Sequence, residues 1–304
     1  MLASEYRDRL AREAGRDRGV KFEEFELRHA GGVFPFVRLS SALIAPTDRV
    51  ILVRAGIHGD ETAGPLTVLE RHAGMFGLAH SRGLKMIVYP LGNPSGFQNG
   101  TRYNCDNDRG DAGNNDFLRY ELADGSFVDD LVPGRPFRAW CWASDERAGV
   151  RLPAETRLQH ELLRRDLPLR IVACLDLHQD RLSAGLPPAA YHYAFGDLSR
   201  YDGIVKDVAD IAPVLRRTPV GAGFNVRIDA AGRVVGDDSG TPAAALTDDR
   251  GFIVRHDGSL TDLCFRLWAA HAVTVETSGA TPLDRAVEVN LAWFRGLVGL
   301  AAGP

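Results

Sequence analysis

Short apolar runs alternate with stretches of helical periodicity along the chain. Such runs, when rich in Val, Ile and Leu, predict strands that are buried on both faces. Four of them stand out: 50–53, 85–90, 170–177 and 272–275. Apolar positions recur with helical spacing over 155–164 and 283–300, which predicts amphipathic helices there.

This alternation predicts an α/β fold with a central mixed, largely parallel twisted sheet flanked by helices on both faces. With 304 residues, 45% of them hydrophobic, the chain can bury a large core, and a single domain over 1–304 is favoured over two. Residues 1–45 predict a helix followed by a hairpin. Residues 111–154 and 221–258 lack strong periodicity, so we expect either walls of a substrate pocket or surface insertions.

The first apolar run stops at a glycine and then presents two metal-binding residue types three positions apart, His58 and Glu61. A later run closes on a second histidine, His178. Ligands bind at the carboxyl ends of strands in open α/β sheets, and catalytic zinc takes three protein ligands. The pattern favours one zinc ion held by these three residues. The alternative is hydrogen-bonded loop histidines, with Glu61 interacting with the dipole of the following helix.

Zinc hydrolysis also needs a carboxylate that moves protons without binding the metal. Glu276 fits, because it ends the last apolar run just before a turn. The alternative is an ordinary surface acid at a strand end. Asp176 lies two residues before His178 and therefore on the same strand face, where it either contacts that histidine or has no such partner.

Taken in chain order, the segments around His58 and Glu61, around His178 and around Glu276 resemble the zinc carboxypeptidase superfamily, including its succinylglutamate desuccinylase/aspartoacylase branch. The resemblance extends from about residue 48 to 298. The resemblance implies that 56–61 (GIHGDE) and 176–178 (DLH) carry the metal ligands. It also implies that Glu276 in 275–277 (VET) is the general base. Residues 92–97 (GNPSGF) resemble the family's Asn-Pro loop, which puts Asn93 among the substrate-binding residues.

The same resemblance assigns two arginines in 101–109 (TRYNCDNDR). Arg102 takes the role of polarising the scissile carbonyl, and Arg109 that of holding a substrate carboxylate. Asp108 stands where the family carries asparagine, and a second alignment places 111–117 on that motif with no arginine. Without the resemblance, both arginines would be solvated side chains that pair with nearby acids for little gain.

Composition narrows the range of partners. The net charge of -4 and the pI near 6.1 leave no electrostatic footprint for nucleic acid or an anionic membrane. Charges occupy the N-terminal stretch where a signal peptide needs an apolar core, and no later run is long enough to span a bilayer, so a cytoplasmic location is expected. The four cysteines are scattered and are expected to be reduced.

Together these features favour a zinc-dependent hydrolase of amide bonds, of carboxypeptidase type, acting on a small or carboxylate-bearing substrate or peptide. The alternative enzyme is an N-acyl amino acid deacylase. It is supported by Arg102-Tyr103 and Cys105-Asp106 and disfavoured by the short stretch after Glu276, which leaves little room for the extra C-terminal β domain of the aspartoacylase branch. A catalytically silent binding protein on the same scaffold is the alternative of another class. The oligomeric state stays open.

Overall fold

A computed structural model describes most of the chain, in these ranges: 1–29, 32–106, 118–128, 131, 135–142, 152–183, 185–220, 227–228, 234–235, 245–254 and 259–303. Arg109 lies outside these residues, as do about half of the expected pocket segment 111–154 and most of the segment 221–258. Their proposed roles therefore stay predictions.

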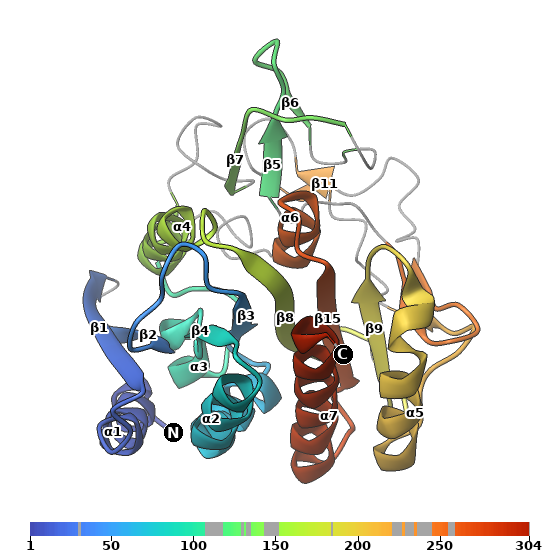
Figure 1. Ribbon diagram of the computed structural model, residues 1–304, viewed down its shortest axis with the longest axis horizontal. Coiled ribbons are helices and arrows are strands. Elements are labelled where there is room, and N and C mark those ends of the chain that lie inside the picture. Colours follow the sequence, from blue (N-terminus) through green and yellow to red (C-terminus); the bar gives the residue numbers. More distant parts are fainter. Residues whose placement is uncertain are drawn as a thin grey trace.

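The described residues form a central eight-stranded sheet in the order β1-β2-β4-β3-β8-β15-β9-β14 (Figure 1). In that order the strands are β1 (Val20–His29), β2 (Gly32–Ser41), β4 (Lys85–Tyr89), β3 (Val50–Ala55), β8 (Ile171–Asp180), β15 (His271–Ser278), β9 (Ala190–Ala194) and β14 (Phe252–Ile253). The four middle strands β4, β3, β8 and β15 run parallel. Antiparallel pairs join β1 to β2, β2 to β4 and β15 to β9. The expected mixed, largely parallel sheet is confirmed.

Helices cover both faces of this sheet, as expected (Figure 1). One face packs against α1 (Ala3–Ala14), α2 (Ala63–Ser81), α5 (Asp202–Ile211) and α7 (Leu283–Ala302). The other face packs against α4 (Ala154–Asp166), α6 (Leu260–Arg266) and a small antiparallel sheet of β5 (Leu118–Glu121), β6 (Phe127–Val128) and β7 (Ala139–Trp142). Among the described helices, none combines the length and apolar character needed to cross a bilayer.

Alternation along the parallel strands decides which side chains meet which helices. Ile51 and Val53 of β3 and Leu175 of β8 belong to the core under α2 and α7. Leu52 and Cys174 point the other way, into the core under α4 and α6. Successive strand residues alternate between the two faces of the sheet. Arg54, two positions after Leu52, and Asp176, two positions after Cys174, therefore also lie on the α4 and α6 side.

The N-terminal residues form α1 and then the β1–β2 hairpin, which pairs from Val20↔Ser41 to His29↔Gly32. Tyr6 of α1 is buried, and its hydroxyl donates to the carbonyl oxygen of Pro65 at 2.8 Å. This contact joins α1 to the start of α2. The β1–β2 hairpin extends the sheet beyond β4, because β2 pairs with β4. It also brings the end of β1 next to α4.

A buried ion pair links the β2 side of the sheet to the end of α4. Arg38 of β2 donates through Nε and Nη2 to the two carboxylate oxygens of Asp166, at 2.7 and 2.9 Å. The hydroxyl of Tyr89 on β4 donates to the same carboxylate. Arg38 and Asp166 are both buried and compensate each other's charge, and Glu23 is a second carboxylate on Arg38.

Replacing Asp166 with alanine should lower the free energy of unfolding by about 3–5 kcal/mol, because the buried Arg38 guanidinium loses its two-pronged carboxylate partner and keeps only its contact with Glu23. Urea denaturation of the purified variant measures this loss. The matched control is Asp207→Ala on the exposed side of α5, which should change stability by less than about 0.5 kcal/mol. Equal midpoints for the two variants would show that the pair does not stabilise the fold.

Candidate metal centre and active site

The turn after β3 brings His58 and Glu61 to the edge of the sheet. Gly56 begins it with a φ of 63°, a left-handed conformation that glycine adopts without strain. Gly59 allows the turn to lie directly on α3 (Pro94–Asn99), since a Cβ atom there would be 2.1 Å from the carbonyl carbon of Gly96. The backbone N–H of Gly59 also donates to the carbonyl oxygen of Arg102 at 3.0 Å.

His178 and Glu276 lie side by side on neighbouring parallel strands. The β8–β15 register pairs His178 with Glu276, and the β15–β9 register pairs Glu276 with Tyr191. Residues paired in this way point to the same face of a sheet. Both strands continue two residues beyond the predicted ligand and base, so these groups sit within the strands, near their carboxyl ends.

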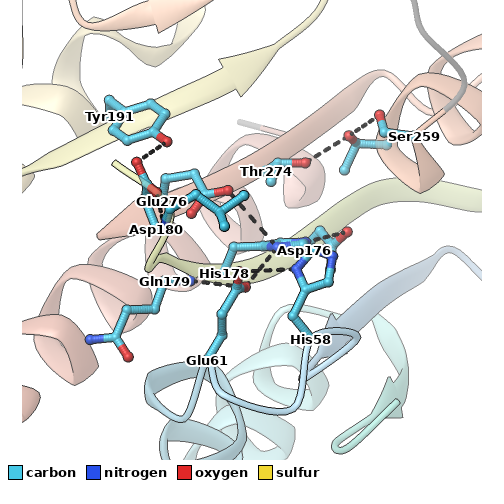
Figure 2. Close-up of polar contacts among 12 residues, drawn as sticks. His58, Glu61, Asp176, His178, Gln179, Asp180, Tyr191, Ser259, Thr274 and Glu276 are labelled. Atoms are coloured by element: carbon cyan, nitrogen blue, oxygen red, sulfur yellow. Dashed lines mark hydrogen bonds and ion pairs between the residues drawn. The ribbon is translucent and has the colours of Figure 1, made fainter. Parts of the chain in front are cut away.

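The three predicted ligands converge on one buried point (Figure 2). Nδ1 of His58 lies 2.9 Å from Oε1 of Glu61, and Nδ1 of His178 lies 3.0 Å from its Oε2. One ligand atom from each residue falls within 4.8 Å of the others. The arrangement brings two imidazole nitrogens and one carboxylate together, a donor set typical of a catalytic zinc site.

Electrostatics keep His58 and Glu61 in their metal-binding forms. Burial, assisted by the Arg102 guanidinium, lowers the pKa of His58 to about 4, so its ring is neutral near pH 7. Burial favours protonation of Glu61, but His58 and His178 outweigh it and hold the pKa of that carboxyl well below its usual range. Neutral imidazoles and an ionised carboxylate are the forms that coordinate a metal ion.

A fully buried ion pair lies behind His178. Oδ2 of Asp176 is 3.2 Å from Nε2 of His178, which settles the question that the sequence left open. Nε of Arg54 on β3 donates to Oδ1 of Asp176 at 3.0 Å. Burial raises the pKa of Asp176, but Arg54 and His178 outweigh it and lower that pKa far below the ordinary value. A carboxylate on the outer nitrogen orients a ligand histidine.

Arg54 is a residue of the site that no sequence motif singled out. The available signal was an arginine inside an otherwise apolar strand, followed much later by an acid in another one. The β3–β8 register pairs Arg54 with Asp176, so two charges far apart in sequence become direct neighbours. A fully buried charge requires such a partner.

Glu276 is buried beside this centre. Its Oε1 lies 3.9 Å from Nδ1 of His178, and within the described residues its Oε2 has no hydrogen-bond partner. Burial raises the pKa of Glu276 well above the usual value, with Glu61 and Asp180 adding to the effect against His178 and Arg102. An ionisable oxygen without a protein partner, on a carboxyl of raised pKa, suits a group that exchanges protons.

Arg102 approaches the same carboxylate from the segment after α3. Its Nη1 donates to Oε1 of Glu61 at 2.7 Å. The backbone around Arg102 is held by Asn93, whose Nδ2 donates to the Arg102 carbonyl oxygen at 3.0 Å. The Asn93 Oδ1 accepts from the Gly96 N–H at 2.8 Å, as the N-cap of α3, and from Nδ2 of Asn104 at 3.1 Å. Asn93 thus has internal contacts, and its expected contact with substrate stays a prediction.

The succinylglutamate desuccinylase/aspartoacylase catalytic domain matches residues 47–199, half of the chain. The chain belongs to this family. The match includes the three proposed metal ligands, Asn93 and both arginines, whereas Glu276 lies beyond it. No curated protein matches the chain.

Solved structures share the fold of this family member. A candidate metallopeptidase from Shewanella amazonensis superposes with a TM-score of 0.64 at 21% identity, covering 99% of this chain and 94% of its own. A metallo-carboxypeptidase from Burkholderia cenocepacia gives 0.56 at 12% identity, over 97% and 68%. One from Pseudomonas aeruginosa, in complex with (2-guanidinoethylmercapto)succinic acid, gives 0.52 at 14% identity, over 96% and 67%. These likenesses confirm the α/β fold.

The close approach at Gly59 yields a stability prediction. Gly59→Ala should destabilise the protein by at least about 1–3 kcal/mol, because the new methyl group overlaps the backbone of α3. The matched control is Gly74→Ala on α2, where a Cβ meets nothing within 4 Å and helix propensity should add up to about 1 kcal/mol. Thermal and urea unfolding measure both changes. Opposite signs are expected, and a neutral Gly59→Ala would contradict the packing described.

Proposed function

We propose that this protein is a zinc-dependent hydrolase of amide bonds that acts on a small, carboxylate-bearing substrate. The observation that carries the proposal is the convergence of His58, Glu61 and His178 beside the unpartnered Oε2 of Glu276, within the residues that the structure describes. The donor set and its protonation fit one zinc ion, and Glu276 is the separate carboxylate that such chemistry requires. Membership of a deacylase family supports the same reaction class.

When bound, zinc supplies Lewis acidity, which polarises a carbonyl group and makes water acidic near neutral pH. In the proposed reaction, Glu276 takes a proton from the attacking water through Oε2 and delivers it to the departing nitrogen. Arg102 donates to the carbonyl oxygen as negative charge develops on it. The Arg102 guanidinium lies against Glu61, which supports this role. Asp176, held by Arg54, keeps the His178 ring in its orientation.

The finer choice lies between an N-acyl amino acid deacylase and a carboxypeptidase. From the sequence the carboxypeptidase type is favoured, because the stretch after Glu276 is short, although Arg102-Tyr103 and Cys105-Asp106 support the deacylase. The family match supports the deacylase, because it names desuccinylase and aspartoacylase activities and covers the metal ligands. A panel of N-acetyl and N-succinyl amino acids, set against short peptides with free carboxyl ends, separates the two. Cleavage of the peptides alone would return the assignment to a carboxypeptidase, and cleavage of neither would support a silent binding protein.

Glu276→Gln should keep the metal while lowering turnover by at least about a hundredfold, the scale of general acid–base catalysis. Glu61→Gln should instead weaken metal retention first, because the amide is a poorer ligand. Metal content by mass spectrometry and turnover of the best substrate are measured on the same samples. Glu70→Gln on the exposed face of α2 is the matched control and should change neither. Near-normal turnover in Glu276→Gln would remove it from the mechanism.

Two conservative substitutions test whether Arg109 holds the carboxylate of the substrate. Arg109→Lys keeps the charge but loses the bidentate fork, so KM for substrates with a free carboxylate should rise by roughly tenfold or more. Hydrolysis of a carboxamide-blocked analogue should change little. Arg102→Lys should lower kcat for both substrates, because a contact that strengthens in the transition state is lost. If the unmodified enzyme cleaves the blocked analogue and the free acid equally well, Arg109 does not hold the substrate carboxylate.

A further inference from the structure

A second cluster of metal-binding residue types lies at the junction of three elements. His29 ends β1, Asp106 follows Arg102 in the same segment, and Glu155 lies in the first turn of α4. One ligand atom from each residue falls within 4.8 Å of the others. In Figure 1 the end of β1 lies beside α4. None of the three residues belongs to the proposed zinc centre.

The His29 ring is fixed inside this cluster. Its side chain is only 7% exposed, and it stacks on Phe34 with the ring centroids 4.8 Å apart. Nε2 lies 3.3 Å from Oε1 of Glu155, and Nδ1 lies 3.9 Å from Oδ1 of Asp106. Nε2 is therefore in contact with Glu155, whereas within the described residues Nδ1 of His29 and Oδ1 of Asp106 have no hydrogen-bond partner. Buried polar atoms in such a state call for a ligand.

Charge balance indicates what that ligand is. Glu155 is fully buried and Asp106 is largely so, yet in the described part of the chain neither forms an ion pair with a lysine or arginine. With a neutral imidazole the cluster carries two buried negative charges, and an imidazolium would leave one. A divalent cation with a neutral His29 removes the imbalance, and uncompensated buried charge is costly.

We propose that His29, Asp106 and Glu155 form a second divalent-cation site in this protein, distinct from the zinc centre. One imidazole nitrogen and two carboxylate oxygens suit zinc or manganese. The Asp106 side chain is 20% exposed, which leaves a route for the ion from solvent. The role of this ion is structural, because it would join β1, the segment that carries Arg102, and α4.

Hydrogen bonds orient both carboxylates and connect this site to Arg102. Glu155 accepts from the Ser95 N–H at 3.1 Å and from Nδ2 of Asn104 at 3.0 Å. Asp106 accepts through Oδ2 from the first N–H of α4, at 2.8 Å. Asn104 also donates to Asn93, which holds the Arg102 backbone. An ion here would therefore tie the arginine-bearing segment to β1 and α4.

Protons are the competing ligand. Burial lowers the pKa of His29, but the carboxylates of Glu155 and Asp106 outweigh it and raise that pKa above the ordinary value. Without an ion, the ring charges as the pH falls and bridges the two carboxylates as an imidazolium. Cation affinity at this site should accordingly fall with decreasing pH.

The experiment counts metal ions on the full-length protein, loaded with zinc alone, dialysed and measured by mass spectrometry. Two equivalents per chain are expected. His58→Ala with His178→Ala should leave one equivalent, which reports the second site alone. Adding His29→Ala and Asp106→Asn should remove it. Zinc should also raise the thermal midpoint of the His58→Ala/His178→Ala protein, and this rise should vanish when His29 is changed.

Glu161→Gln, on the exposed face of α4, is the matched control and should keep both equivalents. A single equivalent that persists when His29 and Asp106 are both changed would overturn the proposal, as would a remaining ion that is indifferent to His29→Ala. Should the His58→Ala/His178→Ala protein fail to fold, His29→Ala with Asp106→Asn in the otherwise unmodified chain must reduce two equivalents to one. Because the count needs no turnover, it stands apart from the test of amide hydrolysis.

Discussion

The site depends on one buried carboxylate, that of Glu61. His58 and His178 approach it from two different elements, Arg102 approaches from a third, and the backbone N–H of Gln179 donates to it at 3.2 Å. A buried negative charge is tolerated only when such donors surround it. Because Glu61 needs these donors, the two histidines that fit zinc lie next to the Arg102 guanidinium, which is proposed to donate to the substrate carbonyl.

Alternation and register in the parallel sheet put the remaining groups on the correct side. His178 and Glu276 pair across β8 and β15 and point to the face covered by α4 and α6. The Arg54–Asp176 pair lies two residues earlier on β3 and β8 and on the same face. A register slip of one residue would turn these polar groups into the apolar core under α2 and α7. The hydrophobic pattern thus specifies the site as strictly as it specifies the core.

Polar contacts hold the segment that carries Arg102. Asn93 and the turn at Gly59 fix its backbone, while Asn104 and Asp106 join it to α4. Glu155 connects this network to His29 on β1. A cation in that cluster would strengthen a connection that otherwise rests on hydrogen bonds and on the charge of one histidine. The proposed zinc centre and the second cluster are in this way linked through one segment of backbone.

The sequence by itself determined the strand runs, the fold class, the family and the identity of His58, Glu61, His178 and Glu276 as candidates, because these signals are local: an apolar run followed by a ligand type. Only the tertiary structure decided that Asp176 has a partner and that Arg54 provides it, and only it brought His29 to Glu155. These contacts join positions far apart along the chain. No local pattern encodes them, since strand order and register arise when the whole sheet assembles.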